Sequence, residues 1–560
     1  MTGRPDHTAP RQTEPTAPCM DPALADDIAS FHGHYRTSGL WDRARLGERF
    51  AANAQSTPDR EAIIDLGGTR RTTYRALDLL SNRLAHWLVA HGIDEGDVIA
   101  VQLPNCLEAA IIALAANKLG VIVNPMLTVY RAKELRYMLG LTRAKAVFVP
   151  DHYRGFAHGA LAADIARDIG HALLPVIVDV PEDGSSPPSR WLSALESWPD
   201  RPCARTPKAT AVSVILFTSG TEAAPKAVMH TEETLNYNIR AVWNAFGMGT
   251  DEVVWMPSPV GHSTGFSFGI RIALFHGTKL VLQDRWNPDD AVAIIQRERP
   301  TYTLAATVFL TDLLQAAHAK GIDISCLRIF GCGGAPIPPH VVMEAAAKGV
   351  NVLRLYGQSE TLVATLNAPS SPLQKRFDTD GMVLGGMTCD IRDDDARSLP
   401  RGTAGELWVT GPGLSLGYFK DAERTRAKFH RGWVQTGDIA TMDADGYVTI
   451  VGRKSEIIIR GGMNITPREI EDEIAKIKGI SAVAVVGLPD ERLGEICCAC
   501  VVADGSVPVT LETITAALRA AGMATYKLPQ RLELIPELPT TASGKIQRHR
   551  LVAALTTARR

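Results

Sequence analysis

Short apolar segments of strand length alternate with amphipathic helical segments along most of this chain. Residues 74–91 have the apolar spacing of a helix, residues 98–103 form a short apolar run, and residues 107–119 are helical again. The order of strand, loop and helix returns after residue 211. This alternation predicts α/β layering, and 560 residues are too many for one ordinary core. We therefore expect at least two domains.

The sequence changes character near residue 453, where we place the main domain boundary. We expect a disordered tail over 1–30, a large multi-subdomain N-terminal domain over 31–453, and a small mobile α+β lid domain over 454–560. Lys454, Ser455 and Glu456 form a polar break before an apolar run. Beyond it, 466–469 predicts a capping box, and Gly522 should end a helix over 511–521.

Composition argues against several classes of partner. The formal net charge is -2, and charged residues make up 21% of the chain, so there is no electrostatic reason to expect nucleic acid or a membrane surface. The apolar run 109–116 is far shorter than the roughly 20 residues of a membrane span. Nine cysteines without zinc-finger spacing indicate reduced core residues, and the tail lacks a signal peptide. We expect a cytoplasmic protein of undetermined oligomeric state, with 181–207 as a surface connector.

A polar loop follows the predicted strand 211–217. Its candidate phosphate-binding residues are Thr218, Ser219, Gly220, Thr221 and Lys226. Hydroxyl groups and backbone N–H groups supply neutral donors, and a lysine supplies charge, which together suit a triphosphate. The loop is not a Walker A motif, because Lys226 is followed by Ala227.

Two later turns suit the base and the metal of a nucleotide. Their candidate residues are Gly333, Gly334, Ala335, Tyr356, Gly357, Gln358, Ser359 and Glu360. Glycines let a planar ring approach the backbone, and Tyr356 offers a face for stacking. Glu360 supplies the carboxylate oxygen that Mg²⁺ prefers. Further along, Asp438 lies in an acidic turn suited to a ribose diol, and Lys545 lies on a flexible turn.

In this order, these segments resemble the core motifs of the adenylate-forming superfamily, which includes acyl-CoA synthetases, luciferases and peptide-synthetase adenylation domains. The resemblance runs from about residue 35 to 555. It implies an ATP-dependent carboxylic acid:CoA ligase, which forms an acyl-adenylate with Mg²⁺ and releases AMP and pyrophosphate. Coenzyme A or a carrier-protein pantetheine would then take the acyl group.

The resemblance also implies a role for each motif. It assigns the loop 218–226 to the β- and γ-phosphates, and it places adenine between 333–335 and Tyr356. It makes Asp438 the acceptor of the ribose hydroxyls, with Arg453 beside the ribose or phosphates, and Glu360 a magnesium ligand.

The same resemblance assigns the moving parts. Lys545 matches the mobile lysine that contacts the carboxylate and the α-phosphate. Gly462 matches the glycine that lines the pantetheine tunnel, and Ser455 occupies the hinge position.

The chain departs from the family pattern in two places. The phosphate loop has Glu222, Ala223 and Ala227 where the family usually has Thr, Gly and Gly, and we expect the Glu222 side chain to point away from the triphosphate. At the hinge, Ser455 replaces the more usual Asp or Lys.

The acyl substrate is constrained by the segment 257–266. His262 matches the position that borders the acyl carboxylate, and this segment has no Asp to pair with the amino group of an amino acid. Ser263 stands where related aryl-acid ligases have an Asn that reads a 2-hydroxyl. We expect an alicyclic, medium-chain or simple aromatic acid, as in the cyclohexanecarboxylate and medium-chain ligases that 228–231 resembles. The candidate pocket residues are Phe266, Phe309 and Gly331.

Other functions stay open at this stage. An acyl- or aryl-AMP ligase that loads a carrier protein, a non-catalytic nucleotide or acyl sensor and a luciferase-like oxygenase would share these motifs. Residues 261–265 also match the G-x-S-x-G pattern of a serine hydrolase that uses Ser263. That motif needs a strand leading straight into the turn, but Pro257 and Pro259 interrupt the approach.

Overall fold

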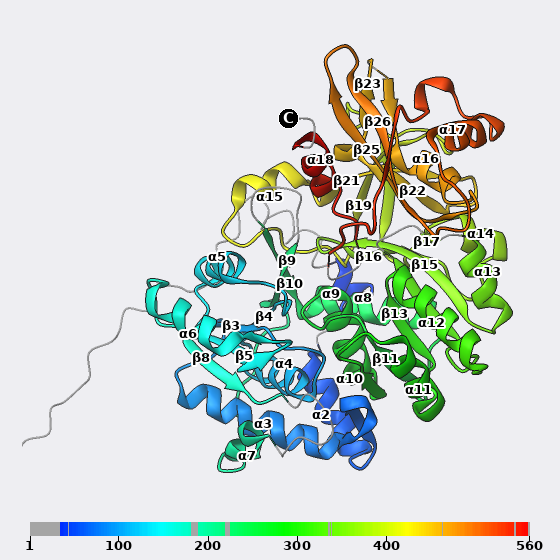
Figure 1. Cartoon of the computed structure of the whole chain (residues 1–560). Coiled ribbons are helices and arrows are strands. Elements are labelled where there is room, and N and C mark those ends of the chain that lie inside the picture. The colour runs from blue at the N-terminus through cyan, green and yellow to red at the C-terminus, as the bar shows by residue number, and fades with distance from the viewer. Residues whose placement is uncertain are drawn as a thin grey trace, which may run out of the picture.

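A computed structural model describes residues 34–42, 44–180, 189–218, 225–333, 337, 339–461, 463–541 and 545–557. The tail expected over 1–30 lies outside these residues. The chain is α/β, as predicted, with a large N-terminal domain built from several sheets and a small C-terminal domain above it in Figure 1.

Two large sheets form the body of the N-terminal domain and lie side by side in the lower part of Figure 1. The six-stranded sheet has the order β10 (Lys226–Thr231), β9 (Val212–Thr218), β4 (Ile122–Pro125), β3 (Val98–Val101), β5 (Ala146–Pro150) and β8 (Leu174–Val178). Its central strands are parallel and fully buried, whereas β10 pairs with β9 antiparallel. Such strands need helices on both faces, which explains their continuous apolar runs.

The nine-stranded sheet has the order β17 (Met382–Val383), β16 (Leu362–Leu366), β15 (Asn351–Gln358), β14 (Ile329–Gly333), β13 (Tyr302–Ala305), β11 (Val253–Met256), β12 (Lys279–Leu282), β1 (Glu61–Asp65) and β2 (Arg70–Thr73). Strands β13, β14 and β15 run parallel to one another, so their carboxyl ends meet at one edge of the sheet. Ligands of open α/β sheets bind at such an edge.

Helices cover both sheets. They are α2 (Leu46–Ser56), α3 (Tyr74–Ala90), α4 (Leu107–Leu119), α5 (Ala132–Thr142), α6 (His158–Asp168), α8 (Glu232–Ala245), α10 (Ile272–His276), α11 (Pro288–Glu298), α12 (Thr307–Lys320), α13 (Pro339–Ala347) and α14 (Leu373–Asp378). Helix α4 is buried on nearly every side, which matches its almost uniformly apolar sequence. The predicted helices over 74–91 and 107–119 are confirmed within one residue.

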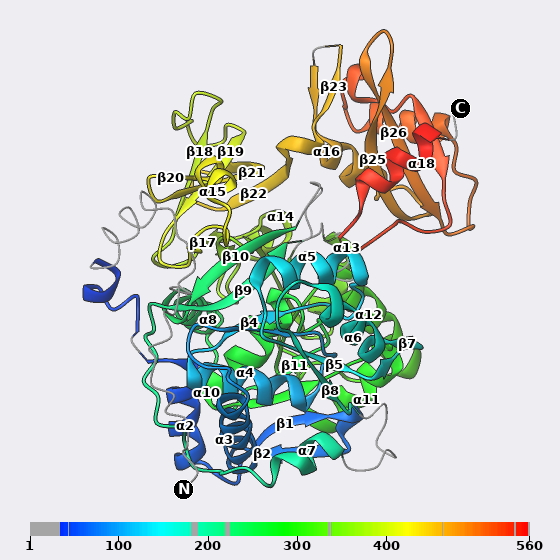
Figure 2. The ribbon, with the colours of Figure 1, turned by 90° about the vertical axis from the view of Figure 1, so that its left-hand side faces the viewer.

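A third sheet stands between the body and the C-terminal domain. It contains β18 (Thr388–Arg392), β19 (Gly405–Thr410), β20 (Phe429–His430), β21 (Trp433–Met442) and β22 (Val448–Arg453), with α15 (Ala422–Lys428) beside it. In Figure 2, β22 leads from this sheet toward α16 of the C-terminal domain. The polar break 454–456 forms a short 3-10 turn directly after β22.

The C-terminal domain has one sheet with helices packed on it. Its strands are β23 (Ile458–Arg460), β24 (Met463–Ile465), β25 (Ile480–Asp490), β26 (Gly494–Ala503) and β27 (Arg531–Leu534), and its helices are α16 (Pro467–Ile474), α17 (Leu511–Ala520) and α18 (Arg548–Thr557). Gly522 follows α17 with φ +79°, as the predicted helix stop requires.

One local prediction was wrong, and the structure adds detail to another. The capping box over 466–469 does not form, because the Thr466 side chain makes no cap hydrogen bond and the Glu469 carboxylate accepts from Lys527 Nζ at 2.6 Å instead. The connector 181–207 contains a short helix, α7 (Arg190–Leu195), started by the Ser189 side chain. Ser189 and Leu195 are buried, so this part of the connector packs against the body.

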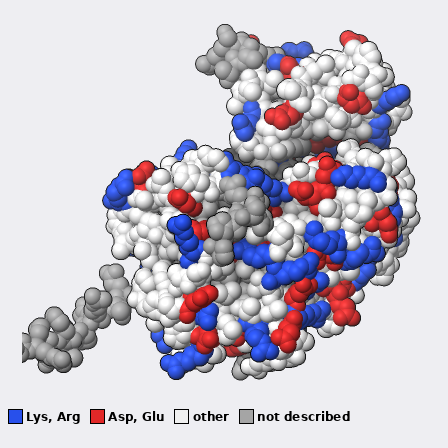
Figure 3. All heavy atoms as spheres, turned by 60° about the horizontal axis from the view of Figure 1, so that its bottom comes forward, with Lys and Arg blue, Asp and Glu red and all other residues white. Residues whose placement is uncertain are grey.

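The surface carries charges of both signs. On the face shown in Figure 3, acidic and basic side chains are interspersed. In the part of the chain that the structure covers, no helix is long and apolar enough to cross a membrane.

Candidate active site

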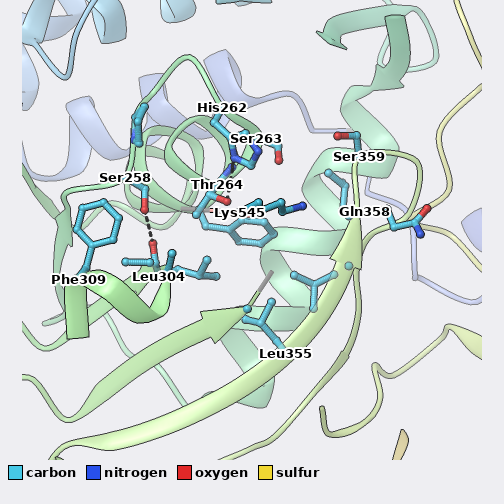
Figure 4. Close-up of a pocket in the computed structure, with 18 residues that line it drawn as sticks. Ser258, His262, Ser263, Thr264, Leu304, Phe309, Leu355, Gln358, Ser359 and Lys545 are labelled. Atoms are coloured by element: carbon cyan, nitrogen blue, oxygen red, sulfur yellow. Dashed lines mark hydrogen bonds between the residues drawn. The ribbon is translucent and has the colours of Figure 1, made fainter. Parts of the chain in front are cut away.

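A cavity of about 110 Å³ lies where the two domains meet, at the carboxyl ends of β13, β14 and β15. Its apolar lining consists of Pro259, Phe268, Leu304, Ala305, Ala306, Phe309, Leu355, Leu362 and Val363. Lys545 of the C-terminal domain also lines it. In Figure 4, Gln358 and Ser359 lie at one side, Phe309 and Ser258 at the other, and Lys545 between them.

Close backbone packing requires two glycines in the lining of this cavity. A Cβ on Gly333 would lie 2.7 Å from the Leu355 carbonyl oxygen, and a Cβ on Gly357 would lie 1.9 Å from the Leu362 carbonyl oxygen. Both residues line the cavity. The adjacent backbones therefore approach more closely than any side chain would permit.

Asp438 is the centre of a buried hydrogen-bond network. Its Oδ2 accepts from the Tyr356 hydroxyl at 2.7 Å and from Gln358 Nε2 at 2.6 Å, and its Oδ1 lies 3.5 Å from Arg453 Nε. Burial and the neighbouring carboxylate raise the pKa of Tyr356 well above its usual value, so its hydroxyl stays protonated and donates. The structure thus brings together four residues that come from three separate motifs of the sequence.

Glu360 is also buried, and its carboxylate is oriented by one tyrosine. The Tyr418 hydroxyl donates to Glu360 Oε1 at 2.7 Å. Lys226 Nζ lies 5.8 Å from the centre of the same tyrosine ring. Glu360 and Lys226 therefore occupy neighbouring positions around Tyr418, which the sequence did not indicate.

Lys545 and His262 both line the cavity, and the charge of Lys545 affects the pKa of His262. Burial lowers the pKa of the Lys545 ammonium, and nearby Arg453 lowers it further, while Asp438 and Glu360 act in the opposite direction. Burial, reinforced by Lys545, lowers the pKa of His262 to about 4. His262 is therefore a neutral imidazole at physiological pH.

Part of the predicted site lies outside the described residues. This applies to Ser219, Gly220, Thr221, Glu222, Ala223, Gly334, Ala335 and Gly462. The flanks of the phosphate loop are described: Thr218 ends β9 and pairs with Lys226 at the start of β10. Ala227 is buried in β10 opposite Phe217, so it belongs to the strand.

Two of the three candidate pocket residues were wrong. Phe309 lines the cavity, but Phe266 and Gly331 do not. Phe266 packs into the main core at the start of a π-helical turn over 266–271, and Phe268 lines the cavity in its place. The Leu304 side chain covers Gly331, because a Cβ on that glycine would lie 3.3 Å from Leu304 Cγ.

The geometry does not support a serine hydrolase. Strand β11 ends at Met256, well before the turn, and Ser263 opens a short helix, α9 (Ser263–Gly265). His262 Nδ1 is engaged by the backbone N–H and the hydroxyl of Thr264. Among the residues with described positions, no histidine hydrogen-bonds the Ser263 hydroxyl, so the nucleophile–base pair of such enzymes is missing.

Sequence reasoning missed two polar residues of this region. Lys428 Nζ donates to the Thr436 carbonyl oxygen at 2.6 Å, beside the Asp438 turn. His230 Nε2 hydrogen-bonds the Ser359 carbonyl oxygen at 2.7 Å. Lys428 belongs to none of the motifs above, and His230, although it lies in the segment 228–231, has no sequence signal that connects its side chain with the site.

Comparison with known proteins agrees with this geometry. The family model of the AMP-binding enzyme matches residues 50–419, and that of the AMP-binding enzyme C-terminal domain matches residues 469–545. The medium-chain fatty-acid–CoA ligase of Escherichia coli (strain K12) is 37% identical over 92% of this chain and 91% of its own length. The 2-hydroxy-7-methoxy-5-methyl-1-naphthoate–CoA ligase of Streptomyces carzinostaticus is 31% identical over 94% and 96%.

A solved structure shows the same architecture. ATP-bound MatB from Rhodopseudomonas palustris superposes with a TM-score of 0.82 at 27% identity, covering 93% of this chain and all of that one. The two-domain α/β architecture and the two family-model matches are those of an adenylate-forming enzyme. The chain belongs to the AMP-binding enzyme family. It is an AMP-forming acid–CoA ligase, which uses ATP, Mg²⁺ and coenzyme A and acts through an acyl-adenylate.

Proposed function

We propose that this ligase activates a compact, largely apolar carboxylic acid of the alicyclic, medium-chain or simple aromatic type. The observation that carries the proposal is the apolar cavity of about 110 Å³ that Lys545 joins from the other domain. An apolar cavity of about 150 Å³ in another protein holds benzene, so this volume suits one ring or a short chain. One of the two relatives above is named for medium-chain fatty acids and the other for a substituted naphthoate, a bicyclic aromatic acid.

The far end of the cavity is closed by a supported wall. The Phe309 ring packs edge-on against Trp286, with ring centres 4.6 Å apart, and Trp286 Nε1 donates to Asp312 Oδ2 at 2.8 Å. The Ser258 hydroxyl, also at this end, donates to the Leu304 carbonyl oxygen at 3.1 Å. The Phe309 ring gives this end of the cavity an apolar surface, which suits an apolar group of the acid.

The nucleotide would be held beside this cavity. Asp438 provides a charged acceptor for the ribose hydroxyls, and Lys226 provides charge for the phosphates. A buried carboxylate at this site also suits Mg²⁺, which is usually held by one or two carboxylates together with phosphate oxygens. We assign that carboxylate to Glu360.

The positions of the charges explain how adenylation proceeds. The acid's carboxylate must attack the negatively charged α-phosphate, so positive charge is needed where the two meet. Lys545 lies in the cavity, and neutral His262 adds no charge that would compete for the carboxylate. Mg²⁺ would supply further positive charge to the phosphates when bound.

The same geometry assigns a role to the C-terminal domain. Lys454 Nζ lies 3.1 Å from Glu406 in the large domain, whereas Glu456 lies 3.0 Å from Arg548 in the small one. Ser455 stands between these two anchors. We place the domain boundary at 453/454 and infer that the small domain turns about Ser455 to let the thiol reach the adenylate.

Pyrophosphate exchange over a panel of acids tests the function. We expect exchange with cyclic, medium-chain or simple aromatic acids and weak exchange with long-chain acids. Phe309→Ala should shift the preference toward longer acids by about tenfold, because a hydrophobic pocket discriminates by roughly that factor per methylene. Phe377→Ala, which changes the same apolar cluster without lining the cavity, should leave the preference unchanged. ADP as a product would contradict the proposal.

The acceptor needs its own assay. Coenzyme A should be acylated in the full reaction; transfer only to a phosphopantetheinylated carrier protein would identify a carrier-loading ligase instead. A cytoplasmic location stays a prediction from the sequence.

A further inference from the structure

Lys428 lies at the nucleotide side of the site although it belongs to no family motif. It ends α15 and directly precedes β20. Its Nζ donates to the Thr436 carbonyl oxygen at 2.6 Å, and a Cβ on Gly437 would lie 3.8 Å from the same nitrogen. The ammonium is therefore fixed beside the turn that carries Asp438.

Charged groups of the site surround this ammonium. It interacts electrostatically with the Glu360 and Asp438 carboxylates, with Lys226 and with Glu406. The adjacent Phe429 packs edge-on against Tyr418, with ring centres 5.9 Å apart; Lys226 lies over that tyrosine ring, and the Tyr418 hydroxyl bonds Glu360. The segment that carries Lys428 is therefore packed against the tyrosine that contacts both Lys226 and Glu360.

The ammonium has unused capacity to bind an anion. Within the described part of the chain, no carboxylate lies within 4.0 Å of Lys428 Nζ, and the Thr436 carbonyl engages one of its three N–H donors. Burial lowers the pKa of this lysine. Keeping a largely buried cation without a close counter-ion costs free energy, and an anionic ligand would offset that cost.

We propose that Lys428 is a second phosphate-binding lysine, which contacts the β- and γ-phosphates of ATP. It lies on the side of Lys226 and Glu360, whereas Lys545 lines the acyl cavity.

During adenylation, a carboxylate oxygen bonds to the α-phosphorus and the bond from that phosphorus to the bridging oxygen breaks. Pyrophosphate leaves with the electron pair, and a cation beside it stabilises the developing charge. This inference rests on the proposed adenylation activity.

Direct binding of nucleotides tests the proposal without knowledge of the acid. Isothermal titration with ATP, AMP and inorganic pyrophosphate would compare wild type with Lys428→Gln, which keeps a donor for the Thr436 carbonyl but removes the charge. We expect ATP and pyrophosphate to bind about tenfold or more weakly, the loss of one charged hydrogen bond, and AMP within about twofold of wild type. Lys428→Arg should restore part of the affinity.

Lys420→Met is the matched control. Lys420 lies in the same part of the chain and also donates to one carbonyl oxygen, that of Leu141 at 3.3 Å, but it is exposed. Its removal should leave all three affinities unchanged. Thermal melting of each variant would confirm that it is folded.

The alternative outcomes are distinct. Equal weakening of ATP and AMP would overturn the proposal, because Lys428 would then only support the ribose turn through Thr436. Unchanged ATP affinity in folded Lys428→Gln would also overturn it. If Lys428→Gln does not fold, Lys428→Arg would be compared with the charge-free Lys428→Met. Equal ATP affinities of these two variants would count against the proposal. Absence of pyrophosphate exchange in wild type would instead contradict the proposed function.

Discussion

The Tyr418 hydroxyl donates a 2.7 Å hydrogen bond to Glu360 Oε1, and both side chains are buried. A buried carboxylate held by one neutral donor keeps its other oxygen available for a cation. The bond joins the turn between β15 and β16 of the large sheet to the segment before α15. Removal of the Tyr418 hydroxyl therefore tests whether this bond orients Glu360.

Tyr418→Phe should raise the Mg²⁺ concentration needed for half-maximal adenylation by about three- to tenfold, because one hydrogen bond that orients Glu360 is lost. A magnesium titration of pyrophosphate exchange would measure the shift. Tyr153→Phe removes a comparable hydroxyl, which bonds Asp284 at 2.8 Å away from the cavity, and should leave the magnesium requirement unaltered. Equal shifts in both variants would contradict the assignment.

Asp438→Asn should raise the ATP concentration needed for adenylation by about 10–100-fold, since hydrogen bonds to the ribose lose a charged acceptor. AMP binding should weaken as well, unlike in Lys428→Gln. Titration calorimetry with both nucleotides would separate the two variants. Asp390→Asn, in the same sheet but bonded to Arg392, is the control. Wild-type AMP affinity in folded Asp438→Asn would remove Asp438 from the ribose site.

Lys545→Ala should slow adenylation by about 10²–10³-fold, the effect of removing one charge-stabilising donor. Thioester formation from synthetic acyl-adenylate and coenzyme A should largely survive, because that step does not need charge at the α-phosphate. Single-turnover assays of each half-reaction would show the difference. Lys527→Ala, which removes a lysine paired with Glu469 in the same domain, should affect neither step.

As the pH is raised, the adenylation rate should begin to fall at a lower pH than it would if Lys545 had the pKa of an ordinary lysine. Burial lowers the Lys545 pKa below 10.5, so the ammonium is present below that lowered pKa and is lost as pH rises through it. His262, with a pKa of about 4, stays neutral over this range. A pH profile of pyrophosphate exchange would show the alkaline decline. The residual activity of Lys545→Arg should lack it; the same decline in that variant would assign it to another group.

Ser455→Pro should slow thioester formation more than adenylation, because a fixed φ between the Lys454 and Glu456 anchors hinders rotation of the small domain. Ser455→Ala, which keeps backbone freedom, is the control and should behave as wild type. The two half-reactions would be timed separately. Equal slowing of both in Ser455→Pro would argue against a hinge here.

The sequence predicted the order of the elements and the loops that carry the motifs. Buried strands such as β9, β14 and β15 are short, largely apolar runs that end in a hydroxyl residue, a glycine and a glutamine, and these signals are local. Asp438, Glu360 and Lys545 could be selected because a carboxylate or a lysine in such a turn has few structural reasons to be there. The domain with the lysine turn was also recognisable from its own helix and strand pattern.

Only the tertiary structure decided which of these residues meet. Tyr356 and Asp438 are 82 residues apart, and their hydrogen bond depends on how two different sheets pack. Lys428 was missed because a single lysine without a motif carries no local signal, and His230 was missed because its segment 228–231 does not indicate the contact with Ser359. Phe266 was a candidate pocket residue from its position alone, but Phe268 lines the cavity, because the π-helical turn sets which ring faces it. Local chemistry is determined by neighbouring residues, whereas contacts across the fold depend on packing between distant segments.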